Sequence, residues 1–356
     1  MLVVLRVKEI PPFLWGNIFF AWLLLATGSS LRAQTLGGQT VFNFLRESNS
    51  PQLSALGGVN VSQENDDLSL AFMQPALLRD SMDRQMVANF NSQYAGISNY
   101  NLMLAYHQPR LNMNFALGAV YVDYGDITQT DPSGNILGDF HPRDYAIQAT
   151  AAGKYLERWY YGFTLKYIGS DLGMYRSNGI AMDVGLNYKI PDRGWQFGLA
   201  AINMGSQLKS YEDAGKEELP FDLQVGISKR LLNAPIQLSL TLDHIHEWNL
   251  EYSDSAFNAT VGVTPSSGFG KRLLEHAILA AQLYATRYIE VTVGYNYLLR
   301  QELSLVSASN GLTGFSLGVG VVLPQFTFRY ARTSYQNSNA YNQVGLDLPL
   351  RKYIGK

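Results

Sequence analysis

The chain has 356 residues and no cysteine, 16% of its residues are charged, and its formal net charge is −2 at pH 7. Soluble domains carry about 25% charged residues, so this composition is poor in charge, while 22 Tyr, 17 Phe and 32 Gly make it rich in aromatic residues and glycine. The absence of thiols excludes a disulfide scaffold, a thiol enzyme and a Cys-ligated metal site. The small net charge excludes electrostatic capture of nucleic acid as the main function.

The first 33 residues have the parts of a secretory signal peptide. Arg6 and Lys8 precede an apolar run over 13–26, and small residues follow before Ala33. We therefore predict a signal peptide over 1–33, cleaved after Ala33. The alternative is a transmembrane anchor, but Asn17 interrupts the apolar run, which is shorter than the about 20 residues that a span needs. A secreted chain of this composition points to the Gram-negative cell envelope.

Apolar residues recur at every second position through most of the remaining chain. In 180–188, for example, Ile180, Met182 and Val184 alternate with Ala181 and Asp183. A period of two predicts a β-strand with one apolar and one polar face. Segments of about ten residues are long enough for a tilted strand to cross a bilayer. Fourteen such segments occur, at 87–94, 99–107, 114–124, 144–154, 159–168, 178–189, 195–203, 221–230, 235–244, 276–286, 288–298, 313–323, 325–333 and 341–348.

The connections between these segments alternate in length. Long ones fall at 125–143, 204–220, 245–275, 299–312 and 334–340, with 169–177 at the place of a further outer loop, and short ones alternate with them, although 95–98 is short where a long one is expected. An even strand number with alternating turns and loops is typical of an outer-membrane barrel. We predict an all-β fold: a 14-stranded antiparallel transmembrane β-barrel over 87–348, a tail over 349–356, and long loops outside the cell. A periplasmic sandwich or propeller is the alternative.

Residues 34–86 do not alternate in this way. Val41 to Arg46 resembles a short helix, and Asp66-Asp67 is placed to cap a helix that begins at Leu68 and is disturbed by Pro75. Such a segment cannot lie in lipid with unpaired backbone groups. A fourteen-stranded barrel is also too wide for its own side chains to fill. We therefore predict a partly helical plug, in the lumen or in the periplasm.

Five charged residues fall on the polar faces of the predicted strands and should point into the lumen. They are Lys166, Asp183, Lys189, Glu290 and Arg329. If they are paired inside the barrel, they could hold the plug; if they are unpaired, they would line a water path. The sequence does not decide between the two.

No set of residues predicts catalysis. His244 and His246 have a spacing that can bind zinc, but no third ligand is evident, so two histidines at the membrane interface are the favoured interpretation. Glu64, Asp66 and Asp67 lack the spacing of an EF-hand, which favours helix capping. We find neither a nucleotide-binding loop nor a nucleophile elbow. The expectation is a protein that is not an enzyme and has no cofactor or metal.

Several motifs, in order along the chain, resemble those of a known family. Residues 55–59 with Gly57 and Gly58, then Asp67, then Gln74, Pro75 and Ala76, are similar to the N-terminal signature of FadL-like fourteen-stranded barrels, in particular those of the type IX secretion system of Bacteroidetes. The commoner form has Asn where this chain has Gln74. Farther on, Asp131 with Gly134-Asn135 and the block at 219–226 resemble the PorQ family. PorV, its sister, shares the fold and the early motifs.

The resemblance implies a scaffold in the outer membrane. PorQ-like proteins belong to a cell-surface attachment complex with the sortase PorU, the shuttle barrel PorV and the surface protein PorZ, which PorQ is thought to hold at the membrane. That complex processes exported cargo and joins it to lipopolysaccharide.

Long loops on a rigid barrel offer a docking surface, although they could also merely shield the rim. We expect the partner to contact loop residues represented by Asp131, Asn135, Phe140, Tyr211, Glu217, Trp248, Tyr252 and Phe269. The alternative function is a FadL-type carrier of hydrophobic small molecules, which should have an apolar pocket between plug and wall and a lateral opening.

Overall fold

The computed structural model describes residues 40–63, 65–93, 96–211, 215–250, 268–303, 311–335 and 340–353. They belong to one compact unit that comprises residues 36–356. The predicted signal peptide over 1–33 lies outside the described residues, as do Glu64 and Tyr252.

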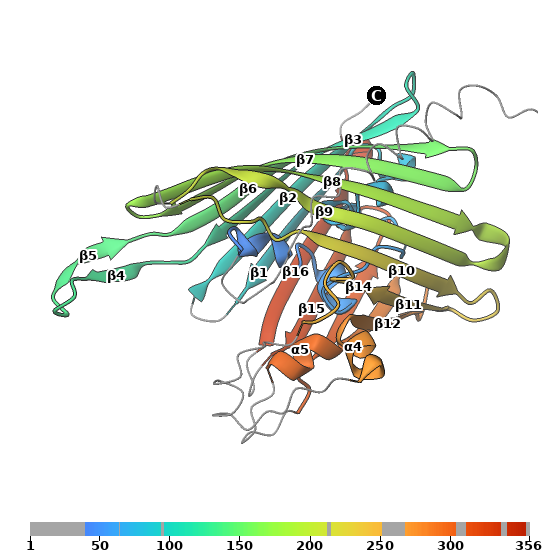
Figure 1. Ribbon diagram of the computed structural model, residues 1–356. Helices are drawn as coiled ribbons and strands as arrows, with labels where there is room; N and C mark the ends of the chain where they lie inside the picture. The colour runs from blue at the N-terminus through green and yellow to red at the C-terminus, as the bar shows by residue number, and fades with distance from the viewer. Residues whose placement is uncertain are drawn as a thin grey trace, which may run out of the picture. The chain divides into compact units, whose positions relative to one another are not determined.

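Fourteen antiparallel strands close into one barrel, in which β1 pairs with both β2 and β16 (Figure 1). This confirms the predicted fold. The barrel strands are β1 (Gln85–Ser92), β2 (Ser98–Gln108), β3 (Met113–Asp123), β6 (Arg143–Tyr155), β7 (Trp159–Leu172), β8 (Tyr175–Ile190), β9 (Trp195–Lys209), β10 (Asp222–Arg230), β11 (Ile236–Leu242), β12 (Ala277–Tyr284), β13 (Ile289–Asn296), β14 (Phe315–Val322), β15 (Thr327–Ser334) and β16 (Ala340–Pro349).

The two faces of the wall differ as the alternation predicts. Leu117 is 65% exposed on the outer face, whereas Asp183 is fully buried on the luminal face. Closure pairs the strand edges with each other, so the backbone leaves no open edge toward lipid. No helix in the described part of the chain is both long and apolar enough to span a membrane.

Three connections differ from the prediction. The strands β7, β8 and β9 are longer than expected, so that only residues 173 and 174 remain between β7 and β8, and the predicted loop 204–220 starts at 210. The predicted loop 125–143 contains two further strands, β4 (Ile127–Thr130) and β5 (Ile136–Phe140), which pair only with each other. They did not alternate in sequence because most of their residues are exposed whichever way they point. We call the end of the barrel that carries β4, β5 and the connections 210–221, 243–276 and 297–314 the long-loop end.

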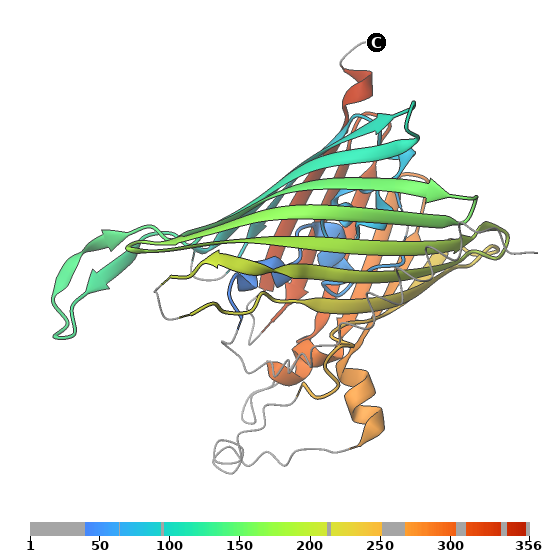
Figure 2. The same ribbon diagram turned by 45° about the horizontal axis from the view of Figure 1, so that its top comes forward.

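The N-terminal segment lies inside the barrel (Figure 2). Its short helices are η1 (Asn43–Arg46), α2 (Pro51–Ala55), η2 (Leu68–Phe72), η3 (Pro75–Leu77) and η4 (Asp80–Met82). The predicted cap is present: the side chain of Asp67 accepts a hydrogen bond from the backbone N–H of Ser69 at the start of η2. Large apolar side chains of the segment, such as Leu53, Leu56 and Phe72, are almost completely buried. The segment is therefore a luminal plug.

Four more short helices in the described part of the chain lie on the rims. The helices α4 (Phe269–Glu275) and α5 (Tyr297–Glu302) belong to connections at the long-loop end. A turn of helix, η6 (Pro191–Arg193), joins β8 to β9, and η7 (Leu350–Lys352) follows β16 near the C-terminus. Figure 2 shows η7 at the end of the barrel opposite to α4 and α5.

Candidate functional site

The plug packs directly against glycines on the luminal face of the wall. We call Gly162, Gly185, Gly198, Gly294 and Gly318, on β7, β8, β9, β13 and β14, the glycine girdle. A Cβ atom at Gly162 would lie 2.3 Å from the carbonyl carbon of Pro75, and one at Gly198 would lie 1.9 Å from the carbonyl oxygen of Val61. Side chains at these positions would overlap the plug, so glycine is what allows its close approach.

The predicted plug motif lies within this contact. Gln74, Pro75 and Ala76 are buried, and the Gln74 side-chain amide donates to the backbone oxygen of Leu199 on β9 at 3.0 Å. Its oxygen accepts from the backbone N–H of Ala76 at the start of η3. Gly57 and Gly58 have φ of +92° and +100°, a backbone conformation that glycine adopts without strain. These residues seat the plug on the wall.

Buried ion pairs form a second contact between plug and wall. Arg329 lies 3.2 Å from a carboxylate oxygen of Asp67 in the plug, and its Nε donates to Glu290 on β13 at 2.7 Å. Lys166 and Asp183 form another buried pair, at 2.7 Å, between β7 and β8. The sequence left open whether the luminal charges are paired or line a water path. These four are paired, and Arg329 holds the plug.

The cavities between plug and wall differ in size: one of about 380 Å³, whose lining residues are mostly polar, lies where Asp66 and Asp83 of the plug face Glu290 and Arg329 of the wall. A cavity lined by Phe44, Phe72 and Met73 from the plug and by Val120 and Ile202 from the wall has a volume of about 10 Å³. That is about the space that one water molecule needs. A small aromatic molecule would not fit there without displacement of the plug.

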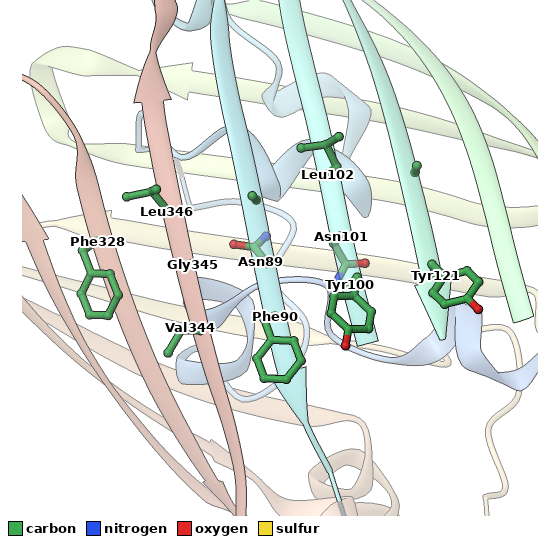
Figure 3. Close-up of a pocket in the computed structure, with 12 residues that line it drawn as sticks. Asn89, Phe90, Tyr100, Asn101, Leu102, Tyr121, Phe328, Val344, Gly345 and Leu346 are labelled. Carbon is green, nitrogen blue, oxygen red and sulfur yellow. The ribbon is translucent and has the colours of Figure 1, made fainter. Parts of the chain in front are cut away.

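A larger groove, of about 420 Å³, lies on the outer, lipid-facing side of β15, β16, β1, β2 and β3 (Figure 3). Phe90, Tyr100, Tyr121 and Phe328 are among the side chains that line it. The strand ladder beneath it is unbroken, with Gly345 of β16 opposite Asn89 of β1. In the pairs β1–β16 and β1–β2 the register has no irregularity, so the groove is not a lateral opening into the lumen.

At the long-loop end, β4 and β5 form a two-stranded arm that projects beyond the barrel, as Figures 1 and 2 both show. Its turn is held by Asp131, whose carboxylate accepts hydrogen bonds from the backbone N–H of Ser133 and from the backbone and side chain of Asn135, at 2.8–2.9 Å. These bonds, the one from the Asn135 side chain foremost, lower the pKa of Asp131. Two of the predicted docking residues thus order the tip of the arm.

The arm exposes apolar side chains beside this ordered turn. Ile136 is 73% exposed and Leu137 is 62% exposed, and Ile127 on the other strand is also exposed. Asp131, Asn135 and Phe140 of this region were predicted docking residues, whereas Ile136 and Leu137 were not. The signal that could have found them is an Ile-Leu pair next to the Asp-Pro-Ser-Gly-Asn turn in a loop that should be polar.

The base of the arm is fixed by His141. Its imidazole Nε2 and Nδ1 each lie 2.9 Å from a carboxylate oxygen, of Asp123 and Asp126 respectively. The hydrogen bond to Asp126 is the largest cause of a raised pKa of His141, and the negative charge of Asp123 adds to it. Phe140 lies against the turn between β7 and β8, because a Cβ at Gly173 would be 3.1 Å from its ring.

The other predicted docking residues lie elsewhere on the long-loop end. The Tyr211 hydroxyl donates to Ser170 at 2.6 Å, and the backbone N–H of Glu217 donates to the side chain of Gln207 at 2.9 Å, so both belong to the 210–221 connection where it lies against the wall. Trp248 and Phe269 contact each other, with ring centroids 5.4 Å apart. The predicted residues therefore fall into three groups along the rim, and Tyr252 is outside the described residues.

No family model and no curated protein matches the chain. Solved structures do resemble it. The toluene transporter TbuX of Ralstonia pickettii is 13% identical, with a TM-score of 0.50 over 86% of this chain and 98% of the transporter. A deltaS2 mutant of the monoaromatic hydrocarbon channel TodX is also 13% identical, with a TM-score of 0.50 over 85% of this chain and 98% of the channel. A FadL homologue of Pseudomonas aeruginosa is 12% identical, with a TM-score of 0.43 over 79% of this chain and 93% of the homologue. The chain thus has the β-barrel fold of TbuX and TodX.

Proposed function

We propose that this protein is a non-enzymatic scaffold of the PorQ kind in the outer membrane. In this proposal the long-loop end faces the cell exterior, and the arm formed by β4 and β5 docks a PorZ-like surface protein. A PorU-like sortase and a PorV-like barrel complete the complex, which processes cargo and anchors it to lipopolysaccharide. The proposal rests on the family resemblance of the sequence motifs and on the structure of the arm.

The observation that carries the proposal is an ordered arm with exposed aliphatic side chains on a barrel that holds a plug in its lumen. Ile136 and Leu137 lie on a hairpin that projects beyond the barrel strands, and both side chains are exposed. Exposed apolar side chains near an ordered polar turn are typical of a protein-binding surface. The plug, seated on the glycine girdle and held by Arg329, supports a role in which nothing flows through the lumen.

Purification from the native outer membrane in mild detergent tests the proposal. Mass spectrometry of the bound material should identify a large surface protein and a sortase-like protease in fixed ratio to the barrel. The double variant Ile136→Lys/Leu137→Lys should lose the surface protein while the barrel stays folded. Thr128→Lys, which adds a charge at an exposed position of the arm opposite Asp139 and away from Ile136, should retain it. Equal retention by both variants would exclude the arm as the docking site.

A carrier of hydrophobic small molecules is the second candidate function. Its support is the fold shared with a toluene transporter and a monoaromatic hydrocarbon channel. In that case the purified barrel should come without protein partners, and a lipid, fatty acid or aromatic compound should be extracted from it. Uptake of such a compound into vesicles that contain the barrel would favour the carrier over the scaffold.

A further inference from the structure

A cluster of histidines and carboxylates lies at the long-loop end, where β10 begins and β11 ends. Asp222 is the first residue of β10, and Asp243 and His244 follow directly after β11. The two strands are antiparallel neighbours, so these residues meet although they are distant in sequence. Within the described residues this is the one group of three such side chains whose ligand atoms all lie within 4.8 Å of one another.

The distances in the cluster match those between the ligands of a metal ion. His244 Nδ1 lies 3.2 Å from an Oδ2 atom of Asp243 and 4.0 Å from Oδ2 of Asp222. In a tetrahedral zinc site with bonds of about 2.1 Å, neighbouring ligand atoms are about 3.4 Å apart. Small side-chain rotations would therefore bring all three atoms into a coordination sphere.

Burial without hydrogen-bond partners is an independent sign that the cluster takes a ligand. Asp243 is 4% exposed, and its Oδ1 has no hydrogen-bond partner; neither has Nδ1 of His244. A buried polar atom without a partner is costly, and more so when it carries charge. A cation bound between these side chains would satisfy both residues.

Asp222 is already held in place for such a role. Its Oδ2 accepts a hydrogen bond from the Gln224 side chain at 2.7 Å, and its Oδ1 accepts one from the backbone N–H of His244 at 2.7 Å. Outer hydrogen bonds of this kind orient the ligands in metalloproteins. The side chains of His244 and His246 are 18% and 12% exposed, so an ion can reach them from the long-loop end.

We propose that a divalent transition-metal ion such as zinc binds to Asp222, Asp243 and His244, with His246 as the fourth ligand. His246 Nδ1 lies 3.7 Å from Oδ1 of Asp222 and has no hydrogen-bond partner. A mixed imidazole and carboxylate set suits zinc, whereas calcium and magnesium prefer sites built from oxygen alone. The sequence offered two histidines without a third ligand, and the pairing of β10 with β11 supplies the carboxylates.

The bound ion would link the end of the barrel wall to the start of the 243–276 connection. His276, buried at the end of that connection, has its Nδ1 2.7 Å from the backbone oxygen of Asp243 and stacks against Trp248. Metal binding would thus fix the end of β11 to the start of β10.

Cobalt titration of the full-length protein in detergent tests the proposal. The protein carries no polyhistidine tag and is first stripped with a chelator. We expect one equivalent of Co²⁺ to bind with the strong visible absorption of a tetrahedral site, and Zn²⁺ to displace it, whereas Ca²⁺ and Mg²⁺ do not. His244→Ala should weaken binding by more than about 100-fold, because loss of an outer hydrogen bond alone costs 10- to 100-fold.

Two further variants make the test decisive. His141→Ala removes a histidine that also lies between two carboxylates, at the base of the arm, and should leave cobalt binding unchanged. Asp243→Asn keeps the size of the side chain and should weaken binding with an unchanged far-UV circular dichroism spectrum. Absence of cobalt binding, or equal binding by the wild type and His244→Ala, would overturn the proposal. Unchanged affinity in His246→Ala would overturn the assignment of the fourth ligand.

Discussion

Replacement of Gly162 by alanine should loosen the plug, because this glycine lets the plug backbone touch the wall. An added Cβ would lie 2.3 Å from the carbonyl carbon of Pro75, 2.5 Å from its oxygen and 2.6 Å from the backbone nitrogen of Ala76, whereas ordinary contacts begin at 3.4 Å. The added Cβ on the wall would meet backbone atoms of the plug, so no flexible side chain can move aside to relieve the clash. The plug would have to withdraw by about 1 Å from a close-packed wall.

The cost of the change follows from the contacts that this shift disturbs. Overpacking of a filled core costs about 1–3 kcal/mol, and we expect the upper part of that range because Gln74, whose hydrogen bonds join the plug to β9, adjoins the displaced residues. Amide hydrogens that exchange through local opening of the plug should then exchange about 30- to 150-fold faster.

Hydrogen exchange of the folded barrel in detergent, read by mass spectrometry on peptides that cover 70–78, measures this effect. Gly270→Ala is the control, because a Cβ there meets nothing within 4 Å and α4 lies outside the plug. Unchanged protection of 70–78 in Gly162→Ala would refute the view that the glycine girdle seats the plug. Faster exchange spread evenly over the barrel strands would instead indicate general destabilisation of the wall.

Two more predictions concern charged groups. Arg329→Met leaves Asp67 and Glu290 buried without their partner, so the free energy of unfolding in urea should fall by about 3–5 kcal/mol. Arg332→Met, at an exposed position of the same strand, is the control. An equal loss of unfolding free energy in both variants would contradict the role of Arg329 in holding the plug. The pKa of His141 is raised by its carboxylate partners, so its contribution to the order of the arm is full at low pH and is lost as the pH rises through that raised pKa. Hydrogen exchange of residues 127–140 is compared between the wild type and His141→Gln at each pH. The difference between their exchange rates, corrected for the intrinsic rate at each pH, should vanish at high pH. A difference that stays constant with pH would contradict the role of protonated His141 in ordering the arm.

The sequence alone determined the barrel. Alternation is a local property, because each strand residue faces either lipid or the lumen and the polarity of its side chain indicates which of the two it faces. The same locality made Asp67 recognisable as a helix cap, because a cap and the backbone N–H that it accepts from lie two residues apart. The count of alternating segments predicted an even number of strands, and the alternating loop lengths independently predicted the long connections at one end.

The tertiary structure decided what the luminal residues do. The sequence placed Arg329 and Glu290 on the polar face of their strands, but only barrel closure around the plug brings Arg329 to Asp67. The arm escaped detection because strands exposed on both faces need no alternation. Likewise, His244 lies close to Asp222 only because β10 pairs with β11. Local patterns record the environment of a residue, whereas its partners depend on which distant segments the closed barrel brings together.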